Sequence, residues 1–432
     1  MNIAIIGTGY VGLPSGAGFA ELGNMVTCID SDKSKIDKLL AGELTIYEDG
    51  LKDMFDKNVR NGRLRFTTSM KEGVEGADLV IIAVGTPPDP VTHQADLKYI
   101  HDAAEELALH LRGYTVVATK STVPVSTGDS IEALISKKNP TADFDVISMP
   151  EFLREGYAVH DFFNPDRLIV GTESERAKDV IRKLYSSYEG RSKIIFVKRR
   201  SAETIKYASN AFLAVKIHYI NEMADFCEKT GADIEEVARG MGLDSRIGPR
   251  FLKPGPGYGG SCFPKDTMAM SFMAWQNKVD MTLINAAIAG NSRRRKAMAG
   301  RVMAAVKDVR EPRIAVWGLA FKEGTDDCRE SPAVEIVYEL IGAGAHVVAY
   351  DPKAMDTARM IFGDHIEYAG SCMEAASGAD ALAILTEWPE FGNADLKELS
   401  SVMKGKNIID CRNALRREDA EKAGFFYKGI GK

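Results

Sequence analysis

Residues 2–12 read Asn-Ile-Ala-Ile-Ile-Gly-Thr-Gly-Tyr-Val-Gly, a short apolar run that leads into the pattern Gly-x-Gly-x-x-Gly. A helical pattern follows from Pro14 to Leu22, and a second apolar run from Met25 to Ile29 ends at Asp30, 18 residues after Gly12. The order of strand, glycine loop, helix and strand is typical of a βαβ unit. This stretch therefore predicts a dinucleotide-binding domain at the start of the chain.

Each glycine of the loop has a separate expected role. Gly7 permits the tight turn, Gly9 lets a pyrophosphate approach the backbone, and Gly12 allows the helix to pack closely on the strand. Asp30 at the end of the second strand is expected to accept hydrogen bonds from ribose hydroxyls, and it would repel a 2′-phosphate. The pattern therefore favours NAD over NADP, although Lys33 and Lys35 lie nearby.

Length and charge narrow the class of protein. The chain has 432 residues, 55 basic and 61 acidic side chains and 45% hydrophobic residues, which predicts a folded protein of two or three domains. A net charge of −6 supplies no basic field for a nucleic acid, so no nucleic-acid partner is expected. The two tight basic clusters, residues 198–200 and 293–296, are interpreted as solvated surface.

Cysteine spacing and hydropathy give further expectations. The six cysteines lie far apart, with no Cys/His grouping at zinc spacing, so no metal site is predicted. No uncharged apolar run approaches the roughly 18 residues that a membrane span needs, and no secretory signal pattern precedes the first strand. No membrane association and a cytoplasmic location with reduced thiols are therefore expected.

Polar loops follow three further apolar runs, residues 78–84, 115–119 and 144–149. The loops are residues 85–87, Lys-Ser-Thr-Val-Pro at 120–124 and Pro-Glu-Phe-Leu-Arg-Glu-Gly at 150–156. Loops after the carboxyl ends of parallel strands face the ligand crevice. For Glu151 the sequence alone leaves a substrate contact and a solvated acid equally open.

The middle of the chain changes to helical periodicity from about residue 201 to 230. Lys206 and Asn210 are four residues apart, so they share one face, where a cation and an amide can polarise one bound oxygen. Taken alone, this pair is more typical of a solvated helix surface.

The segment Gly-Pro-Gly-Tyr-Gly-Gly-Ser-Cys-Phe-Pro-Lys-Asp at 255–266 is the most informative one. Pro264 suits the first turn of a helix, which would place Cys262 at the helix N-terminus beside Lys265. Both features favour the nucleophilic thiolate. Cys262 is therefore a candidate nucleophile, whereas Cys28, Cys227 and Cys372 are expected to be buried apolar residues.

A second α/β pattern begins at residue 313, with a helix near 332–341 and apolar runs at 346–350, 381–385 and 407–409. Lys322, Arg329 and Arg412 fall in its loops, where phosphates or a carboxylate could be held. The predicted fold class is α/β, with two Rossmann-like doubly wound domains (1–200 and 301–432) joined by a central helical domain (201–300) that carries a long helix.

These segments together resemble the nucleotide-sugar dehydrogenase family, and within it the UDP-glucose 6-dehydrogenase branch. The resemblance runs along essentially the whole chain. It is carried by the motifs quoted above and by Lys-Tyr-Ala-Ser-Asn-Ala-Phe at 206–212 and Phe-Lys-Glu-Gly-Thr-Asp-Asp-Cys-Arg-Glu-Ser at 321–331. It implies oxidation of the C6 hydroxyl of UDP-glucose to UDP-glucuronate with two NAD⁺, through a thiohemiacetal and a thioester on Cys262.

The resemblance also implies roles for individual residues. Lys206 and Asn210 would stabilise the oxyanion, Glu151 would act as general base, and Asp266 with Thr122 would orient the water. Arg246 would reach a neighbouring subunit's sugar, which implies a homodimer or larger assembly. The implied NAD contacts, with the glycine loop, are Gly7, Gly9, Val11, Gly12, Asp30, Lys35, Thr86, Thr122, Glu155, Lys265 and Arg329. The implied sugar-nucleotide contacts are Glu151, Phe152, Leu153, Arg154, Glu155, Lys206, Asn210, Arg246, Arg250, Phe251, Leu252, Lys253, Gly259, Lys322 and Arg412.

Several alternatives remain at this point. GDP-mannose dehydrogenase shares the cysteine and the adjacent Lys-Asp, and a dehydrogenase for an N-acetylated UDP-sugar is a more distant option. A two-electron 3-hydroxyacid dehydrogenase would leave the Cys262 loop unexplained, and a NAD-sensing scaffold would not need Cys262, Lys206, Asn210 and Asp266 intact. Pro14 and Ser126 depart from the family pattern, and both are expected to affect packing more than chemistry.

Overall fold

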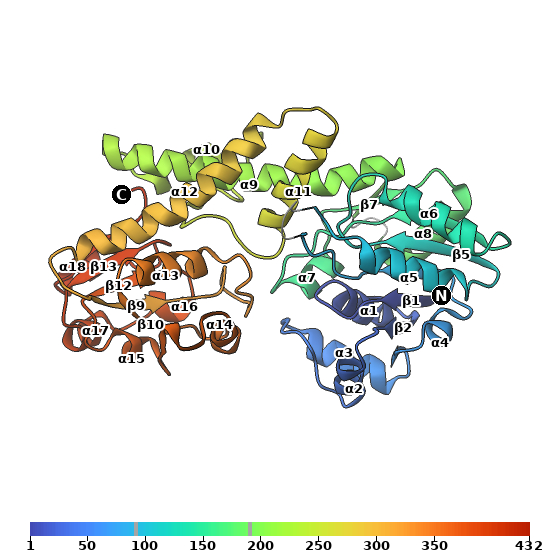
Figure 1. Cartoon of the computed structure of the whole chain (residues 1–432), viewed down its shortest axis with the longest axis horizontal. Helices are drawn as coiled ribbons and strands as arrows, with labels where there is room; N and C mark the ends of the chain where they lie inside the picture. The colour runs from blue at the N-terminus through green and yellow to red at the C-terminus, as the bar shows by residue number, and fades with distance from the viewer. Residues whose placement is uncertain (90–93, 189–191) are drawn as a thin grey trace. The chain divides into compact units, whose positions relative to one another are not determined.

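The computed structural model describes residues 1–89, 94–188 and 192–432. The chain divides into two compact units, Met1–Ser209 and Asn210–Lys432, and helix α9 (Arg199–Thr230) crosses the boundary between them (Figure 1). The division into three domains at residues 201 and 301 stays a prediction.

The first unit is built on a sheet of eight strands in the order β3-β2-β1-β4-β5-β6-β7-β8. Neighbouring strands are parallel except β6 and β7, which pair antiparallel. The order of the first six strands is that of the doubly wound dinucleotide-binding fold. The strands are β1 (Asn2–Ile6), β2 (Met25–Ile29), β3 (Leu64–Thr67), β4 (Leu79–Ile82), β5 (Tyr114–Thr119), β6 (Asp143–Ser148), β7 (Arg167–Gly171) and β8 (Lys193–Val197).

Both faces of this sheet are covered by helices, which explains why its central strands are apolar throughout. In β1, Ile3 and Ile5 pack into the core on one face, while Ala4 and Ile6 pack into the core on the other. Helix α1 packs beside β1 and β2 (Figure 1). The helices of this unit before α9 are α1 (Gly12–Glu21), α2 (Lys33–Leu40), α3 (Leu51–Arg60), α4 (Met70–Val74), α5 (Lys98–Ala108), α6 (Thr127–Lys138), α7 (Ala158–Phe163), α8 (Glu175–Leu184) and the 3₁₀ helix η1 (Ser186–Tyr188).

The two departures from the family pattern have different structural costs. Pro14 lies in the first turn of α1 and is buried, and its missing N–H costs nothing because first-turn amides have no intrahelical acceptor. Ser126 precedes α6 with a φ of +79°, a conformation that costs a non-glycine residue about 1 kcal/mol. Its N–H and that of Gly128 donate to the buried Glu203 carboxylate at 2.7 and 2.9 Å, which fixes the start of α6.

The second unit contains a parallel sheet of six strands in the order β11-β10-β9-β12-β13-β14. Its strands are β9 (Arg313–Trp317), β10 (His346–Tyr350), β11 (Glu367–Tyr368), β12 (Ala381–Ile384), β13 (Asn407–Asp410) and β14 (Phe426–Lys428). Its helices after α9 are α10 (Ile234–Gly242), α11 (Phe263–Gln276), α12 (Thr282–Ala305), α13 (Pro332–Gly342), α14 (Met355–Phe362), η2 (Gly363–His365), α15 (Cys372–Ala376), α16 (Pro389–Gly392), α17 (Leu396–Val402) and α18 (Arg417–Lys422).

The second sheet repeats the layout of the first at its crossover point. Gly318 follows β9 with a φ of +95°, as Gly7 follows β1 with a φ of +104°. Asp351, after β10, accepts hydrogen bonds from the backbone N–H groups of Leu319 and Ala320, as Asp30 does from Thr8. The prediction of two Rossmann-like sheets with a long helix between them in sequence is confirmed.

Five of the described strands are absent from the predictions: β3, β7, β8, β11 and β14. All five lie toward the edges of their sheets, and β7 and β8 extend the first sheet beyond the six strands of the dinucleotide-binding order. No helix in the described part of the chain is both long enough and apolar enough to cross a membrane.

Candidate active site

The glycine loop after β1 has the shape that a dinucleotide needs. A methyl group on Gly12 would lie 1.9 Å from the Gly7 carbonyl oxygen, whereas one on Gly9 would meet nothing within 4 Å. The loop is therefore closed on itself at Gly12 and open at Gly9, next to the N-terminus of α1, where Val11 is the N-cap residue. Backbone amides at such a helix start bind a pyrophosphate.

Asp30 lies at the end of β2, as predicted. One oxygen of its carboxylate accepts from the Thr8 N–H at 2.9 Å and the Thr8 hydroxyl at 2.7 Å, and Lys35 Nζ is 3.9 Å away. A ribose bound there would donate to a carboxylate already held in place by the glycine loop. The structure therefore brings Asp30 and Lys35 together beside the loop.

A hydrogen bond between two predicted site residues, Thr86 and Thr122, joins the loops after β4 and β5. The Thr86 hydroxyl donates to the Thr122 carbonyl oxygen at 3.0 Å, and Ser121 Oγ donates to the Val84 carbonyl oxygen at 2.6 Å. The two loops that were expected to face one crevice are thus connected directly.

A buried group of three charges lies at the carboxyl end of this sheet. Lys206 Nζ donates to Glu151 Oε1 at 2.8 Å and to the Glu151 carbonyl oxygen at 2.9 Å, and both side chains are buried. The Leu153 N–H donates to the other carboxylate oxygen at 2.5 Å. Lys120, at the end of β5, is also buried and interacts electrostatically with both. The interpretation of Lys206 as a surface lysine is therefore wrong, and so is that of Glu151 as a solvated acid.

Burial and charge oppose each other in this group. Burial raises the pKa of Glu151, but the Lys206 ammonium and its hydrogen bond, the Leu153 N–H and Lys120 together lower that pKa below its usual value. Burial and the Lys206 charge lower the pKa of Lys120 to about 8, against the opposing effect of Glu151. Lys120 is not among the predicted site residues, although a lysine directly after a buried strand was a signal for it.

Of the residues after Glu151, Phe152 lies near the buried charges, whereas Arg154 pairs elsewhere. The Phe152 ring lies under the Arg167 guanidinium at 3.6 Å and near Lys206 Nζ at 5.4 Å. Arg154 is exposed and forms a two-pronged ion pair with Asp161. Arg167 was not predicted, because nothing in its local sequence marks it.

In the second unit, Cys262 is the N-cap residue of α11 and Pro264 lies in the first turn, as predicted. Cys262 is exposed, and Ser261 Oγ lies 3.6 Å from its sulfur. A helix N-terminus stabilises a thiolate. The other five cysteines are buried, and burial raises the pKa of each thiol: Cys28, Cys227, Cys328, Cys372 and Cys411. This matches the buried apolar role expected for Cys28, Cys227 and Cys372.

Asp266, one turn into α11, is fully buried and ionically paired. Its two carboxylate oxygens accept from Asn210 Nδ2 at 2.6 Å and from Lys265 Nζ at 2.6 Å. The structure thus joins three predicted site residues, and it fixes the Asn210 amide on the same helix α9 that carries Lys206 four residues earlier.

Other predicted contacts of the second unit have their own partners. Arg412 is held by the carbonyl oxygens of Leu385 and Phe321 and by Glu387. Leu252 is buried in the hydrophobic core, so only its backbone could reach a ligand. Arg246 is exposed and pairs with Asp244. The remaining predicted contacts of this unit are exposed or partly buried: Arg250, Phe251, Lys253, Gly259, Lys322 and Arg329.

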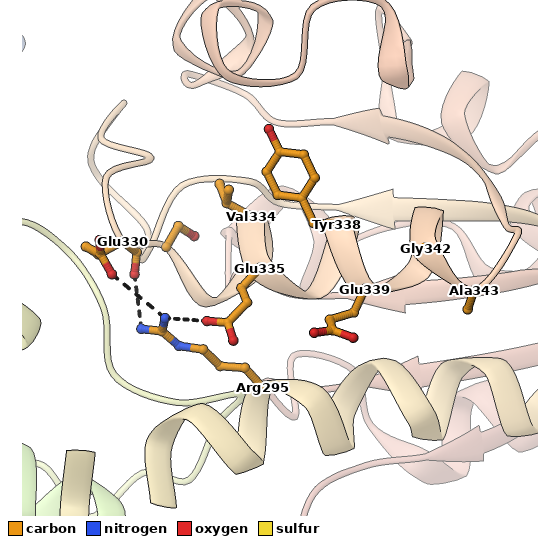
Figure 2. Close-up of a pocket in the computed structure, with 9 residues that line it drawn as sticks. Arg295, Glu330, Val334, Glu335, Tyr338, Glu339, Gly342 and Ala343 are labelled. Carbon is orange, nitrogen blue, oxygen red and sulfur yellow. Dashed lines mark hydrogen bonds and ion pairs between the residues drawn. The ribbon is translucent and has the colours of Figure 1, made fainter. Parts of the chain in front are cut away.

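The interpretation of residues 293–296 as solvated surface is wrong for two of them, because Arg294 and Arg295 are buried. Arg295 lies at one end of a groove of about 650 Å³ between α12 and α13 (Figure 2), which contains none of the predicted site residues. Among the described residues there is no group of three or more His, Cys, Asp or Glu that could hold a metal ion.

Three family models match the chain. They are those of the UDP-glucose/GDP-mannose dehydrogenase family: the NAD binding domain at residues 1–189, the central domain at 200–293 and the UDP binding domain at 315–417. The chain belongs to the UDP-glucose/GDP-mannose dehydrogenase family. Its first unit therefore contains an NAD-binding domain, which agrees with the open Gly9 and the placement of Asp30.

Individual relatives agree with this assignment. The chain is 49% identical to the UDP-glucose 6-dehydrogenase of Rhizobium meliloti over the whole of both chains, and 45% identical to UDP-glucose 6-dehydrogenase TuaD of Bacillus subtilis over its whole length and 93% of that protein. The solved UDP-glucose dehydrogenase of Pyrobaculum islandicum is 36% identical, with a TM-score of 0.92 over 99% of this chain and 96% of that one. The recognised family resemblance is confirmed.

The glycine loop of this family member gives a matched pair of substitutions. Gly12→Ala is expected to destabilise the protein by about 2–4 kcal/mol, because its methyl group would collide with backbone. Gly9→Ala is expected to leave the melting temperature within about 2 °C but to raise the KM for NAD about tenfold, a loss of about 1.4 kcal/mol. Thermal unfolding and steady-state kinetics measure both. Equal effects of the two substitutions on stability would contradict the assigned roles.

Proposed function

We propose that this chain oxidises the C6 hydroxyl of UDP-glucose to the carboxylate of UDP-glucuronate, with two NAD⁺ reduced and one water consumed per sugar. The observation that carries the proposal is Cys262, the one exposed cysteine among the described residues, at the N-terminus of α11 with its helix neighbour Asp266 paired to Asn210. A two-electron alcohol dehydrogenase has no use for such a thiol.

The thiol lets one enzyme carry out two oxidations. NAD, when bound, accepts the hydride in each of them. After the first oxidation, Cys262 Sγ forms a bond to C6 of the aldehyde, and the resulting thiohemiacetal can lose a second hydride to become a thioester. Water then attacks C6, the C–S bond breaks, and the carboxylate and the free thiol are released.

The other residues are assigned by what their chemistry allows. Glu151, kept ionised by its cations, is the proposed general base for the alcohol or the water. Lys206 and Asn210 are proposed to stabilise the oxygen that becomes negative at C6, and Asp266 and Thr122 to orient the water. The NAD contacts and sugar-nucleotide contacts implied by the family resemblance are proposed to hold for the same residues here.

GDP-mannose and other nucleotide sugars remain the alternative substrates, since the family itself includes GDP-mannose dehydrogenases. The UDP-glucose relatives quoted above span the whole chain, which favours UDP-glucose. We also propose a cytoplasmic location, because no disulfide joins any of the six cysteines in the described structure.

We propose that the protein forms a homodimer or a larger assembly through α9. Phe212, Tyr219 and Phe226 are seven residues apart on this helix, so they form one row, and they are 66%, 46% and 60% exposed. Three large exposed aromatics in one row fit a second copy of the same helix better than water. The exposed Arg246 is proposed to contact the sugar bound by the neighbouring subunit.

The yield of NADH per sugar tests the reaction. The wild-type enzyme is expected to form two NADH per UDP-glucose, and Cys262→Ser is expected to lose at least about a thousandfold in turnover, because a serine hydroxyl is a far weaker nucleophile. Absorbance at the NADH band, with product analysis, measures both. A yield of one NADH with an active Cys262→Ser enzyme would refute the four-electron reaction, and two NADH from GDP-mannose alone would change the substrate.

The pH dependence tests the buried charges. Lys120→Met removes one of the two cations that lower the pKa of Glu151, so that pKa rises and the acid limb of kcat/KM is expected to move to higher pH. The shift is measured from about pH 3 to 9, because the acid limb of the wild type lies below the usual pKa of a glutamate. The substitution Lys137→Met, at an exposed lysine of α6, is the control. An acid limb that stays in place in Lys120→Met would remove Glu151 as the group that must be ionised.

The aromatic row tests the assembly. The double substitution Phe212→Lys with Phe226→Lys is expected to reduce the mass of the particle to that of one chain, because buried lysines would oppose association. Phe426→Lys, at a 62% exposed phenylalanine on β14, is the matched control and is expected to leave the mass unchanged. Light scattering after size exclusion measures the mass. A double variant with the wild-type mass would place the interface elsewhere.

A further inference from the structure

One face of α12 carries three buried polar residues that the proposed reaction does not use. Asn291, Arg294 and Arg295 are between 5% and 7% exposed. Two of them, Arg294 and Arg295, lie in the basic run 293–296 that was expected to be solvated. Buried charges are retained only where they have partners, so the partners show what this face is for.

The partner of Asn291 is the backbone of Tyr258, four residues before Cys262. Asn291 Oδ1 accepts from the Tyr258 N–H at 2.9 Å, and Asn291 Nδ2 donates to the Tyr258 carbonyl oxygen at 2.9 Å. The preceding residue, Gly257, has a φ of +133°, and a methyl group there would lie 2.6 Å from Asn291 Oδ1. The Asn291 side-chain amide therefore forms hydrogen bonds with both backbone groups of Tyr258, as a neighbouring strand would do in a sheet.

Arg295 connects the Tyr258 backbone to the segment around Glu330 and Glu335. Its Nη2 donates to the Tyr258 carbonyl oxygen at 2.8 Å and to the Glu330 carbonyl oxygen at 3.3 Å, while its Nη1 donates to Glu335 Oε2 at 2.7 Å. Figure 2 shows the Arg295 side chain reaching from α12 to Glu335 on α13 and to Glu330 just before that helix. The guanidinium thus holds the Cys262 loop against the turn that precedes α13.

Arg294 holds the loop at an earlier point. Its Nε donates to the Gly255 carbonyl oxygen at 2.6 Å, and Asn221 Oδ1 on α9 accepts from the Gly255 N–H at 2.8 Å. Residues 254–258 form no backbone-to-backbone hydrogen bond with another residue in the part of the chain that the structure describes. Side chains of α9 and α12 therefore supply the restraints that secondary structure does not.

We propose that Asn291 and Arg295 are positioning residues for Cys262: they fix the loop so that the thiol stands at the N-terminus of α11. The inference rests on the proposed role of Cys262 as nucleophile. Neither residue touches the reacting atoms, so both act through the Tyr258 peptide. Loosening of that peptide would let the sulfur leave the helix end, where its thiolate is stabilised, and a displacement of about 1 Å costs up to about a hundredfold in rate.

The test compares Asn291→Ala and Arg295→Met with Lys296→Met, whose side chain is 63% exposed on the same helix. The rate of alkylation of Cys262 by iodoacetamide is measured against pH, together with kcat and KM for UDP-glucose. Only Cys262 is exposed, so one adduct per chain is expected. The first two variants are expected to shift the alkylation profile to higher pH and to lower kcat about ten- to a hundredfold, with KM changed less than about threefold. Lys296→Met is expected to match the wild type.

Arg295→Lys separates positioning from folding. Lysine keeps the positive charge but has all its N–H donors on one nitrogen, whereas Arg295 serves Glu335 and the Tyr258 carbonyl oxygen from two separate nitrogens. Partial recovery of the alkylation profile and of kcat is therefore expected. If Arg295→Met does not fold, the lysine variant and Asn291→Ala decide the matter. A lowered melting temperature with unchanged alkylation and kcat in these variants would overturn the inference. The alkylation rate does not depend on turnover, so an active Cys262→Ser enzyme would refute the proposed function and leave this measurement valid.

Discussion

Close packing against the backbone of a glycine is the constraint on which both parts of the proposed site depend, the dinucleotide loop and the Cys262 loop. At Gly12 the first turn of α1 lies against the Gly7 carbonyl, and the space that remains open is at Gly9. At Gly257 the Cys262 loop lies against Asn291. A single added methyl group would fill either contact, and the phosphate-binding helix end or the cysteine loop would have to move. Packing at glycine therefore sets where the cofactor and the thiol can be.

Burial of charged and polar side chains is the second constraint, and three such side chains lie on helix α9. Glu203, Lys206 and Asn210 are three or four residues apart on this helix, and each side chain is buried against a partner. Glu203 caps α6 and thereby fixes the segment after the Lys-Ser-Thr-Val-Pro loop. Lys206 and Asn210 hold two carboxylates, Glu151 and Asp266. Within the first unit α9 thus holds a carboxylate that follows the sheet, and within the second unit it holds the carboxylate one turn after Cys262.

The charges around Glu151 show how a buried carboxylate is kept ionised. Burial alone would raise the pKa of Glu151 and favour its protonated form. The adjacent Lys206 ammonium, with Lys120 nearby, reverses the sign of the shift. The same low-dielectric setting lowers the pKa of Lys120 to about 8, so the balance depends on all three groups together.

The sequence by itself determined most of the strands, the glycine loop, Asp30 and the place of Cys262 at the start of a helix, because each of these follows from local pattern: apolar runs, glycine spacing and a proline in the first turn. It could not decide whether Lys206 and Glu151 are buried, since a lone charged residue has the same local sequence on a surface as in a core. Only the tertiary structure showed that Lys120 joins them and that Arg294 and Arg295 are buried rather than solvated. Their partners, the Gly255 and Tyr258 carbonyl oxygens, lie more than thirty residues away along the chain. Pairing at that distance is set by how helices pack, and no spacing of neighbouring residues records it.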